Sequence, residues 1–425
     1  MSSKAKFIPF SLAMLFAFLA TPVIGQSGKP SQKVSRAESW VLSRIAEGAL
    51  ANLADRFPNE EDRVLSSAFL QDLFSKDPKD LHVGRKGVQI GHAVVKDEVD
   101  LGFTDVPYDV ALFAFRFERK VNFSFSDFRK NVSLWKTTFA GPVLFQSTNI
   151  NGTLRASETH FTDQNSGVSF LSMKVGDLAV FDGATFDGPA VFDGATLHTL
   201  DIREAMFNSK SDPPSFFDTK CGTFEFALLT PEPNAKPRFA SSPEFEGMTF
   251  DRIYSDYTDF GSLSVLCSYS KFSPGFYSEV EAYLRKNGDN DRADELFIEQ
   301  KQRERKERVR GFPRLTNLFL DIVVGYGRKP QRALYLGLLI VGLGCVVFWS
   351  EQGMVPQDIR ENSATTYNPF WYSLDLFAPV IDLQSAKNWM PKQHRAFARN
   401  YVHLHRILGW VLVPIGIAAW TGILK

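Results

Sequence analysis

The chain has 425 residues, which is room for two or three domains, and its 48 basic residues balance its 48 acidic ones. This balance excludes the strongly basic charge typical of nucleic-acid-binding proteins, and the three scattered cysteines exclude a disulfide framework, leaving at most one bond between Cys221 and Cys267. The 39 phenylalanines are far more than usual, so the fold has to accommodate many bulky apolar side chains.

Residues 1–25 have the pattern of a secretory signal peptide. Lys4 and Lys6 give a basic start, and the apolar stretch that follows, about 14 residues long, is too short for a comfortable membrane span. Val23 and Gly25 are the small residues expected before a cleavage site after Gly25. An uncleaved membrane anchor is the alternative, and either interpretation sends the following residues out of the cytoplasm.

Residues 36–85 are predicted to form a small helical cap. Apolar residues at helical spacing indicate one short helix within 39–56 and another within 62–74. We expect these helices to cover the open end of a solenoid, because its terminal backbone groups would otherwise be exposed.

Between residues 87 and 272 a large apolar residue recurs about every five positions, as in Phe181, Phe186, Phe192 and Leu197. Neither the helical period nor the strand period gives this spacing, but a chain that turns a corner at each step does. The pattern therefore predicts a four-sided β-solenoid with about 20 residues per coil, roughly eight coils and layers about 4.8 Å apart. The proline-rich stretch 208–240 is predicted to form loops that bulge from one face.

The stretches from Gly183 to Asp187 and from Gly194 to His198 resemble the repeat unit of the pentapeptide-repeat family, in which an alanine precedes a central leucine or phenylalanine by two positions. The resemblance covers less than half of the chain and implies a right-handed quadrilateral β-helix. Some members of that family mimic DNA with an acidic face. This chain has no acidic excess, and a signal peptide would keep it from DNA, so we expect no nucleic-acid partner.

Residues 277–330 return to helical spacing. Two helices are predicted over 278–286 and 291–309, joined by a turn at Asn287 to Asp289. The basic run 301–314 contains interleaved acidic residues, which favours an ion-paired solvated helix over a phosphate or lipid site. Residues 315–324 suit a helix that lies on a bilayer surface.

Residues 331–425 are predicted to form a membrane hairpin with uncharged spans at 333–349 and 407–424. Two buried helices of a soluble core are the alternative. Segments such as Tyr372 to Asp375 and Leu408 to Trp410 resemble the membrane tail of a group of uncharacterised bacterial proteins, which implies a multi-pass protein of the bacterial inner membrane and no known activity. A signal peptide would place the solenoid in the periplasm, whereas the basic run beside the first span opposes that orientation.

The connection between the two spans holds the first candidate site. Residues 368–383 are aromatic and apolar but carry Asp375 and Asp382, which would be costly within a membrane unless they served ions. The segment is therefore either a pore-lining re-entrant loop or, preferably, an interfacial helix with Trp371 and Tyr372 among the lipid headgroups.

A second candidate site lies just before the second predicted span. On a helix, Arg399, His403 and Arg406 share one face, which we expect to contact anionic lipid headgroups. His403 and His405 point apart on the same helix, which argues against a metal site.

No catalytic motif, metal-ligand spacing or cofactor fingerprint is present, so we expect no enzyme, no cofactor and no metal. The sequence predicts a membrane-tethered repeat protein that presents a rigid binding or scaffold surface to an unidentified protein partner in the cell envelope. The membrane helices offer a surface for self-association. The alternative is an ion-conducting assembly formed by the membrane hairpin.

Overall fold

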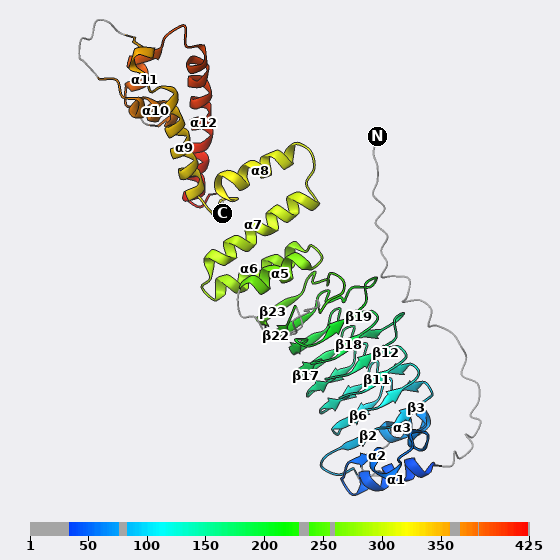
Figure 1. Ribbon diagram of the computed structural model, residues 1–425. Coiled ribbons are helices and arrows are strands. Elements are labelled where there is room, and N and C mark those ends of the chain that lie inside the picture. The colour runs from blue at the N-terminus through cyan, green and yellow to red at the C-terminus, as the bar shows by residue number, and fades with distance from the viewer. Residues whose placement is uncertain are drawn as a thin grey trace, which may run out of the picture.

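The computed structural model describes residues 34–75, 83–228, 238–255, 260–357, 366–380 and 382–423. The predicted signal peptide at 1–25 lies outside these residues. The described chain forms a parallel β-solenoid of about six turns, with helices at both ends and a further helical region beyond its C-terminal end (Figure 1). This arrangement confirms the predicted fold class.

Short helices and a two-residue strand cover the N-terminal end of the solenoid. They are α1 (Arg36–Ala46), β1 (Ala51–Asn52), α2 (Leu53–Arg56), the 3-10 helix η1 (Glu60–Arg63) and α3 (Ser67–Ser75). The carboxylate of Glu38 accepts hydrogen bonds from the backbone of Ser35 and from both the backbone and the hydroxyl of Ser66, so it joins the start of α1 to the start of α3. Because β1 pairs with the first solenoid strand, the predicted cap does cover the open edge of the first coil.

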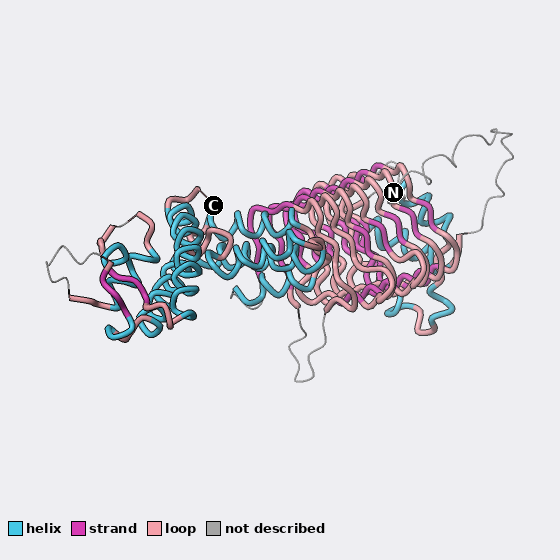
Figure 2. The backbone as a smooth tube through the Cα atoms, turned by 90° about the horizontal axis from the view of Figure 1, so that it is seen from above, coloured by secondary structure: helices cyan, strands magenta, loops and turns pink. Residues whose placement is uncertain are grey.

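The solenoid strands form parallel ladders, and Figure 2 shows the coils stacked as successive layers along one axis. One ladder contains β3 (Val94–Val95), β7 (Arg116–Phe117), β11 (Thr138–Phe139), β15 (His160–Phe161), β18 (Thr185–Phe186) and β21 (Met206–Phe207). A second contains β4 (Val99–Asp100), β8 (Val121–Asn122), β12 (Val143–Leu144), β16 (Val168–Ser169) and β19 (Ala190–Val191).

The remaining strands belong to one sheet that covers two sides of the solenoid. One side contains β2 (Val88–Gly91), β6 (Val110–Phe113), β10 (Val132–Ser133) and β14 (Leu154–Arg155), and the other contains β5 (Asp105–Val106), β9 (Asp127–Phe128) and β13 (Asn149–Ile150). The two sides merge in the longer strands β17 (Lys174–Val180), β20 (Thr196–Asp201), β22 (Lys220–Phe226) and β23 (Thr249–Ser255). In the later coils a single strand therefore runs across the corner between the two sides.

The coils are longer than predicted, with a repeat of about 22 residues, and there are about six coils, not eight. Val88 aligns with Val110, Val110 with Val132, and Val132 with Leu154, so successive partners lie one such repeat apart. The sides alternate between six and five residues, as in the starts of β2, β3, β4 and β5 at residues 88, 94, 99 and 105. The predicted spacing of five residues per side is therefore correct for every second side only.

The additional residue coincides with a left-handed backbone conformation that recurs every eleven residues, twice per coil. In the first coils the positions with positive φ are His92, Phe103, Ala114, Phe125, Lys136, Ser147 and Glu158. Glycines such as Gly183 and Gly194 take the same role later. An L-amino acid pays roughly 1–2 kcal/mol for this conformation, whereas glycine pays almost nothing. The true repeat is therefore an eleven-residue half coil.

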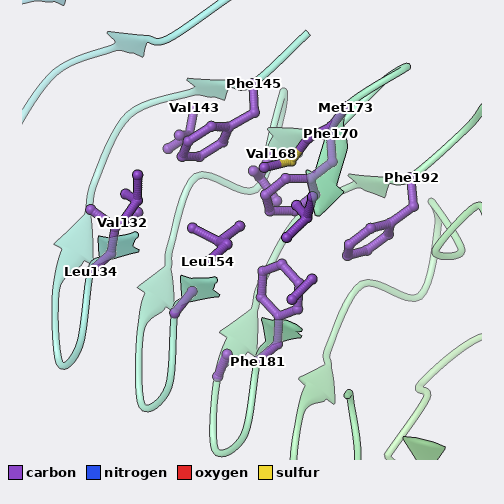
Figure 3. Close-up of a cluster of buried hydrophobic side chains, with 14 of the residues drawn as sticks. Val132, Leu134, Val143, Phe145, Leu154, Val168, Phe170, Met173, Phe181 and Phe192 are labelled. Carbon is purple, nitrogen blue, oxygen red and sulfur yellow. The ribbon is translucent and has the colours of Figure 1, made fainter. Parts of the chain in front are cut away.

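Two columns of stacked phenylalanine rings fill the interior. One contains Phe117, Phe139, Phe161, Phe186, Phe207 and Phe239, with consecutive ring centroids 4.7–5.3 Å apart. The other contains Phe123, Phe145, Phe170, Phe192, Phe216 and Phe245, with centroids 4.6–5.4 Å apart. Figure 3 shows part of this interior, where Phe145, Phe170 and Phe192 project from successive coils. The columns explain the excess of phenylalanine in the composition.

Buried hydroxyls connect the coils inside the wall. The side chains of Thr137, Thr148 and Thr159 each donate a hydrogen bond to the carbonyl oxygen 25 residues earlier, at 2.7–2.8 Å. All three residues are fully buried. Each hydroxyl thus finds an acceptor one layer away, which removes the desolvation cost of a buried polar group.

The solenoid ends earlier than predicted. Its last strand, β23, ends at Ser255, and α5 (Phe260–Tyr269) is a helix, whereas the sequence pattern predicts a β-helix to residue 272. The next helix, α6 (Pro274–Lys286), closes the C-terminal end, because the ring of Phe276 stacks on that of Phe245 at 4.6 Å and so extends one phenylalanine column into a helix. Helix α6 forms the predicted helical pair with α7 (Asn290–Glu307).

The C-terminal helical region follows α7. It contains α8 (Phe312–Val324), α9 (Gln331–Val347), the 3-10 helix η2 (Glu351–Gly353), β24 (Met354–Pro356), α10 (Pro369–Phe377), α11 (Ser385–Asn388), β25 (Trp389–Pro391) and α12 (Ala396–Trp420). Helices α9 and α12 run alongside each other in opposite directions, and α10 packs against both (Figure 1). Strands β24 and β25 pair at the end of α9 and the start of α12.

Candidate functional site

An exposed pair of aromatic rings lies on one corner of the solenoid. Phe103 and Phe125 occupy equivalent positions in successive coils, and their rings stack at 4.9 Å with an angle of 9° between the planes. Both residues have a left-handed backbone, with φ of 60° and 61°, and their exposed fractions are 80% and 53%. We call these two residues the aromatic corner.

The fold does not require aromatic side chains at this corner. Higher in the same column the left-handed position is taken by Ser147 and later by Gly194, and the backbone ladder continues past both. Glycine is the residue that this conformation favours, and exposed phenylalanine gains little from burial. In two later coils an exposed apolar residue, Leu171 or Phe217, directly precedes the left-handed position, which is itself occupied by Ser172 or Asp218.

Sequence reasoning missed the aromatic corner. Phe103 and Phe125 each come two residues after an inward-facing residue, Leu101 and Phe123, and are therefore out of phase with the buried beat. That phase difference is the signal from which the corner could have been found.

The C-terminal region contains one helix, among the described residues, that is long and apolar enough to cross a membrane. This helix is α12, with 25 residues, and α9 is apolar but has 17 residues. The predicted spans at 333–349 and 407–424 thus fall on α9 and on the later part of α12. Large apolar side chains that are exposed on these two helices are Leu334, Tyr335, Leu338, Leu339, Leu343, Val346, Phe397, Leu404, Ile407, Trp410, Val411, Ile417 and Trp420.

The three predicted lipid contacts lie on the exposed side of α12. Arg399, His403 and Arg406 are all exposed, whereas His405 is completely buried on the other side of the helix. The predicted sharing of one face is therefore present in the structure. His403 and His405 point in different directions and do not come together.

His405 belongs to a buried polar contact that fixes α10 between α9 and α12. Its Nε2 atom lies 3.0 Å from the backbone oxygen of Ser373 and 3.2 Å from the Ser373 hydroxyl, which donates a hydrogen bond to the carbonyl oxygen of Val341 at 2.9 Å. Small residues permit this approach: a Cβ atom on Gly344 would lie 2.1 Å from the Ser373 hydroxyl, and one on Gly409 would lie 1.7 Å from the Phe377 carbonyl oxygen.

The two aspartates between the predicted spans organise local turns. The carboxylate of Asp375 accepts hydrogen bonds from the backbone N–H groups of Leu383 and Ala386, at 2.8 and 2.7 Å. Asp382 is exposed and pairs with Lys387, and this hydrogen bond from the ammonium group lowers the pKa of the Asp382 carboxyl below its usual value. Both carboxylates are therefore already engaged in contacts within the connection.

The two predicted interfacial aromatics have different surroundings. Trp371 is half exposed, whereas Tyr372 is buried with its ring 5.0 Å from that of Phe348. Of the two, only Trp371 is exposed. The four residues singled out in 368–383 therefore do not line one common surface of the chain.

An apolar groove lies where α9, α10 and α12 meet, and residues of all three helices line it. Its volume is about 350 Å³, and its wall includes Ala333, Gly337, Phe377, Leu412 and Gly416. Among the described residues that line it, none carries a charge. The groove has the chemistry of a hydrocarbon environment and offers no ligands for an ion.

Ion pairs connect the solenoid-proximal helices to the start of α9. Asp321 on α8 is largely buried and lies 2.9 Å from Arg305 on α7, with Arg332 on α9 at 3.8 Å. Arg328, in the turn before α9, pairs with Glu281 on α6 at 3.2 Å. We call the contacts of Asp321 and Arg328 the joint.

The predicted ion pairing of the basic run is also present in part, in Lys301 with Glu304 and Arg303 with Glu307.

Over the described ranges of the chain, no group of three or more His, Cys, Asp or Glu side chains is arranged to hold a metal ion. Cys221 and Cys267 are free and buried, and burial raises the pKa of the Cys221 thiol to about 12. Comparison of the chain with protein-family models, with curated proteins and with solved structures gives no match.

Proposed function

We propose that this protein is a membrane-tethered scaffold of the bacterial cell envelope, which holds a rigid β-solenoid beside the inner membrane and presents it to a protein partner. The pentapeptide-like half coils around Gly183 and Gly194 support a solenoid of the pentapeptide-repeat type, although its coil is longer. The long apolar helix α12 and the shorter apolar helix α9 support the tether. The signal peptide predicted at 1–25 favours the periplasmic side for the solenoid.

Rigidity follows from the way in which the parts are connected. The phenylalanine column passes from the solenoid into α6 through Phe245 and Phe276, and the joint connects α6 and α7 to α8 and α9. Separating Arg305 from Asp321 would leave an unpaired charge in a largely buried position, which is energetically costly. The helices are therefore expected to stay together at the joint. A binding surface on the solenoid would therefore keep a fixed distance from the tether.

The aromatic corner is the observation that carries the proposal. Two phenylalanines stand where the backbone favours glycine, and each carries a conformational cost of roughly 1–2 kcal/mol. They gain a ring-to-ring contact of about 0.5–1.5 kcal/mol but remain largely in water. The left-handed backbone itself belongs to the coil, because His92, Ala114 and Lys136 hold it on another corner. The feature that indicates a binding surface is therefore the exposed aromatic pair at positions where the fold needs no aromatic side chain. Aromatic residues are also enriched where proteins bind one another.

Photo-crosslinking in intact membranes tests this proposal. A benzophenone side chain is placed at Ser147, the next position of the column after Phe125, and the matched control carries it at Glu158, which has the same left-handed conformation half a coil away. We expect a crosslinked product of one defined mass from position 147 and none from position 158. The product should disappear in the variant Phe103→Gly with Phe125→Gly, while that variant still folds.

A product that persists without the two phenylalanines, or equal products from both positions, would contradict the assignment of the partner surface to this corner. Mass spectrometry of the product then identifies what was bound, including a second copy of the chain.

One observation keeps an ion-conducting assembly as the second candidate: α10 packs between α9 and α12, as a re-entrant segment of a simple channel would. The apolar groove and the engaged carboxylates of Asp375 and Asp382 offer it no ion pathway within one chain. Ion flux through liposomes that contain the wild-type protein, compared with Asp375→Asn and Asp382→Asn variants, tests it. Absence of flux from the wild type under all ionic conditions would eliminate this candidate.

A further inference from the structure

Helix α8 exposes an apolar face that nothing in the described chain covers. Its exposed apolar residues are Phe312, Leu315, Leu318, Phe319 and Ile322. Their spacing of three, four and seven residues places them on one side of the helix. Phe312 and Ile322, at the two ends of this side, have exposed fractions of 79% and 58%. We call these five residues the apolar face of α8.

The opposite side of α8 is fixed to the rest of the protein. Asp321 is held by Arg305 through the joint, and Val323 and Val324 are buried. Leu320 packs in the same cluster as Ala333 of α9. The apolar face therefore cannot turn inward without breaking the joint.

The position of α8 relates this face to the two apolar helices. Figure 1 shows α8 across the end of the α9–α12 pair, next to the C-terminus and between that pair and α7. It contacts both α9 and α12. The exposed Trp420 at the end of α12 lies at the same end of the pair and is suited to the headgroup layer. A bilayer that surrounds α9 and α12 would thus reach its headgroup region near α8.

Basic residues gather where α8 begins. Arg310 and Arg314 are exposed on either side of the start of the helix, and Lys306 is exposed near the end of α7. Among the described residues none of the three forms an ion pair, whereas the neighbouring acids are occupied: Glu307 by Arg303, and Asp321 by Arg305. The free charge beside the apolar face is therefore positive.

We propose that α8 lies in the headgroup layer of an anionic leaflet, with its apolar face among the upper acyl chains and Arg310 and Arg314 on lipid phosphates. Each basic residue close to such a surface contributes through attraction to the anionic headgroups, and the five apolar side chains contribute through burial. This inference rests on the proposed membrane tether. It adds a second attachment that sets the direction in which the solenoid leaves the membrane.

Fluorescence of the full chain in vesicles tests the proposal. An environment-sensitive dye is attached to a cysteine at Leu318 on the apolar face, or at Lys286 on α6 as the matched control, in a Cys345→Ala background, because Cys221 and Cys267 are buried. The probes are phosphatidylcholine vesicles with and without phosphatidylglycerol, each with brominated chains as the quencher. We expect a blue-shifted emission and bromine quenching at position 318 and neither at position 286.

The charges are tested with the double variant Arg310→Glu and Arg314→Glu, and with Arg252→Glu and Lys286→Glu on the solenoid side as the control. We expect wild-type quenching by brominated phosphatidylglycerol to exceed that by brominated phosphatidylcholine at least twofold. The ratio should fall to one in the α8 variant and stay unchanged in the control.

Emission at position 318 that stays water-like, while the protein resists extraction by alkaline carbonate, would overturn this inference and leave the tether intact. Carbonate extraction of the wild type would refute the tether and this inference with it. A blue shift without lipid quenching, together with disulfide crosslinking at position 318 between copies, would assign the apolar face to a second copy and also overturn the proposal.

Discussion

The left-handed residues at the corners decide how this chain coils. His92, Ala114 and Lys136 hold this conformation once per coil on one corner, and Phe103 and Phe125 hold it on another. Each position turns the chain by a backbone conformation that most L-amino acids avoid. The turn persists with these residues because the ladders on either side fix the backbone.

Two phenylalanine substitutions separate interior residues from surface residues. Phe139→Ala removes a fully buried ring from a stacked column and is expected to cost about 3–5 kcal/mol of unfolding free energy. Phe103→Gly relieves the left-handed strain and loses only the exposed stack with Phe125, so its change is expected within about 1 kcal/mol. Urea unfolding monitored by circular dichroism measures both, and a large loss for Phe103→Gly would give the aromatic corner a structural role.

The carboxylate of Glu38 makes the stability of the cap depend on pH. Burial acts to raise its pKa, but hydrogen bonds from the Ser66 hydroxyl and from the backbone of Ser35 and Ser66 outweigh burial, and the folded-state pKa lies below the usual value of 4.5. Because the folded pKa is the lower one, the stabilisation is fully present above pH 4.5 and is lost as the pH falls through the folded pKa.

Glu38→Gln should therefore lower the free energy of unfolding at pH 7 by about 1 kcal/mol, the usual contribution of a helix cap. The free energy of unfolding of this variant should also fall less than that of the wild type when the pH is lowered below 4.5. The exposed Glu47, at the other end of α1, provides the control substitution Glu47→Gln, for which we expect little change. Urea unfolding at pH 7 and pH 4 gives both values. Equal acid sensitivity in all three proteins would exclude Glu38 as the group responsible.

At the scale of elements, the helix α10 depends on glycines in its two neighbours. Gly409 on α12 lies against the backbone of Phe377, where a Cβ atom would come within 1.7 Å of the carbonyl oxygen. A Cβ atom on Gly342 of α9, in contrast, would have no neighbouring atom within 4 Å. The three helices thus approach most closely on the side that carries Ser373 and His405.

Gly409→Ala is expected to displace α10 and to destabilise the helical region by about 1–3 kcal/mol, the usual cost of overpacking. Gly342→Ala places its methyl group in open space and should be neutral or slightly stabilising, because alanine favours a helix over glycine. Thermal unfolding of the full chain in detergent micelles compares the two. Equal melting temperatures for Gly409→Ala and the wild type would show that α10 does not pack as described.

At the scale of the whole molecule, the solenoid should tolerate changes in length only in whole coils. Deleting residues 132–153 removes one complete coil and restores the alignment of Val110 with Leu154. We expect this variant to fold and to be shorter by one layer, about 4.8 Å. Deleting residues 132–151 instead, the length of one coil of the pentapeptide type, would shift both phenylalanine columns out of register and should prevent cooperative folding.

Circular dichroism, thermal unfolding and small-angle scattering distinguish the two deletions. A stable fold after deletion of 132–151, with loss of the fold after deletion of 132–153, would contradict the observed register.

The sequence was sufficient to predict which residues fill the solenoid, because only large apolar side chains can do so. Phe186, Phe192, Leu197 and Phe207 all point inward and are at most 3% exposed. The coil length was not predictable from the beat, since left-handed corners occupied by Phe103 or Lys136 leave no glycine signal. The early end at Ser255 was missed because the apolar residues of α5 continue the same spacing.

The candidate site was less accessible from sequence than the fold. Asp375 and Asp382 looked costly beside an apolar segment, but the turns around α11 use their oxygens, a contact that depends on how the chain after α10 folds back. Tyr372 looked interfacial, yet helix packing against Phe348 buries it. The aromatic corner was missed, although its phase relative to the buried residues was readable in the sequence. The sequence did predict a surface-lying helix over 315–324, and the structure adds which side of α8 stays uncovered.

Labelling of intact spheroplasts with a membrane-impermeant thiol reagent tests the central claim most directly. Single cysteines are introduced at Lys136, on the solenoid, and at Glu351, just beyond α9, in a Cys345→Ala background. A solenoid tethered in the periplasm by a two-helix hairpin predicts labelling at position 136, and labelling at position 351 only after the membrane is permeabilised. Labelling of both positions, or of neither, before permeabilisation would contradict the account.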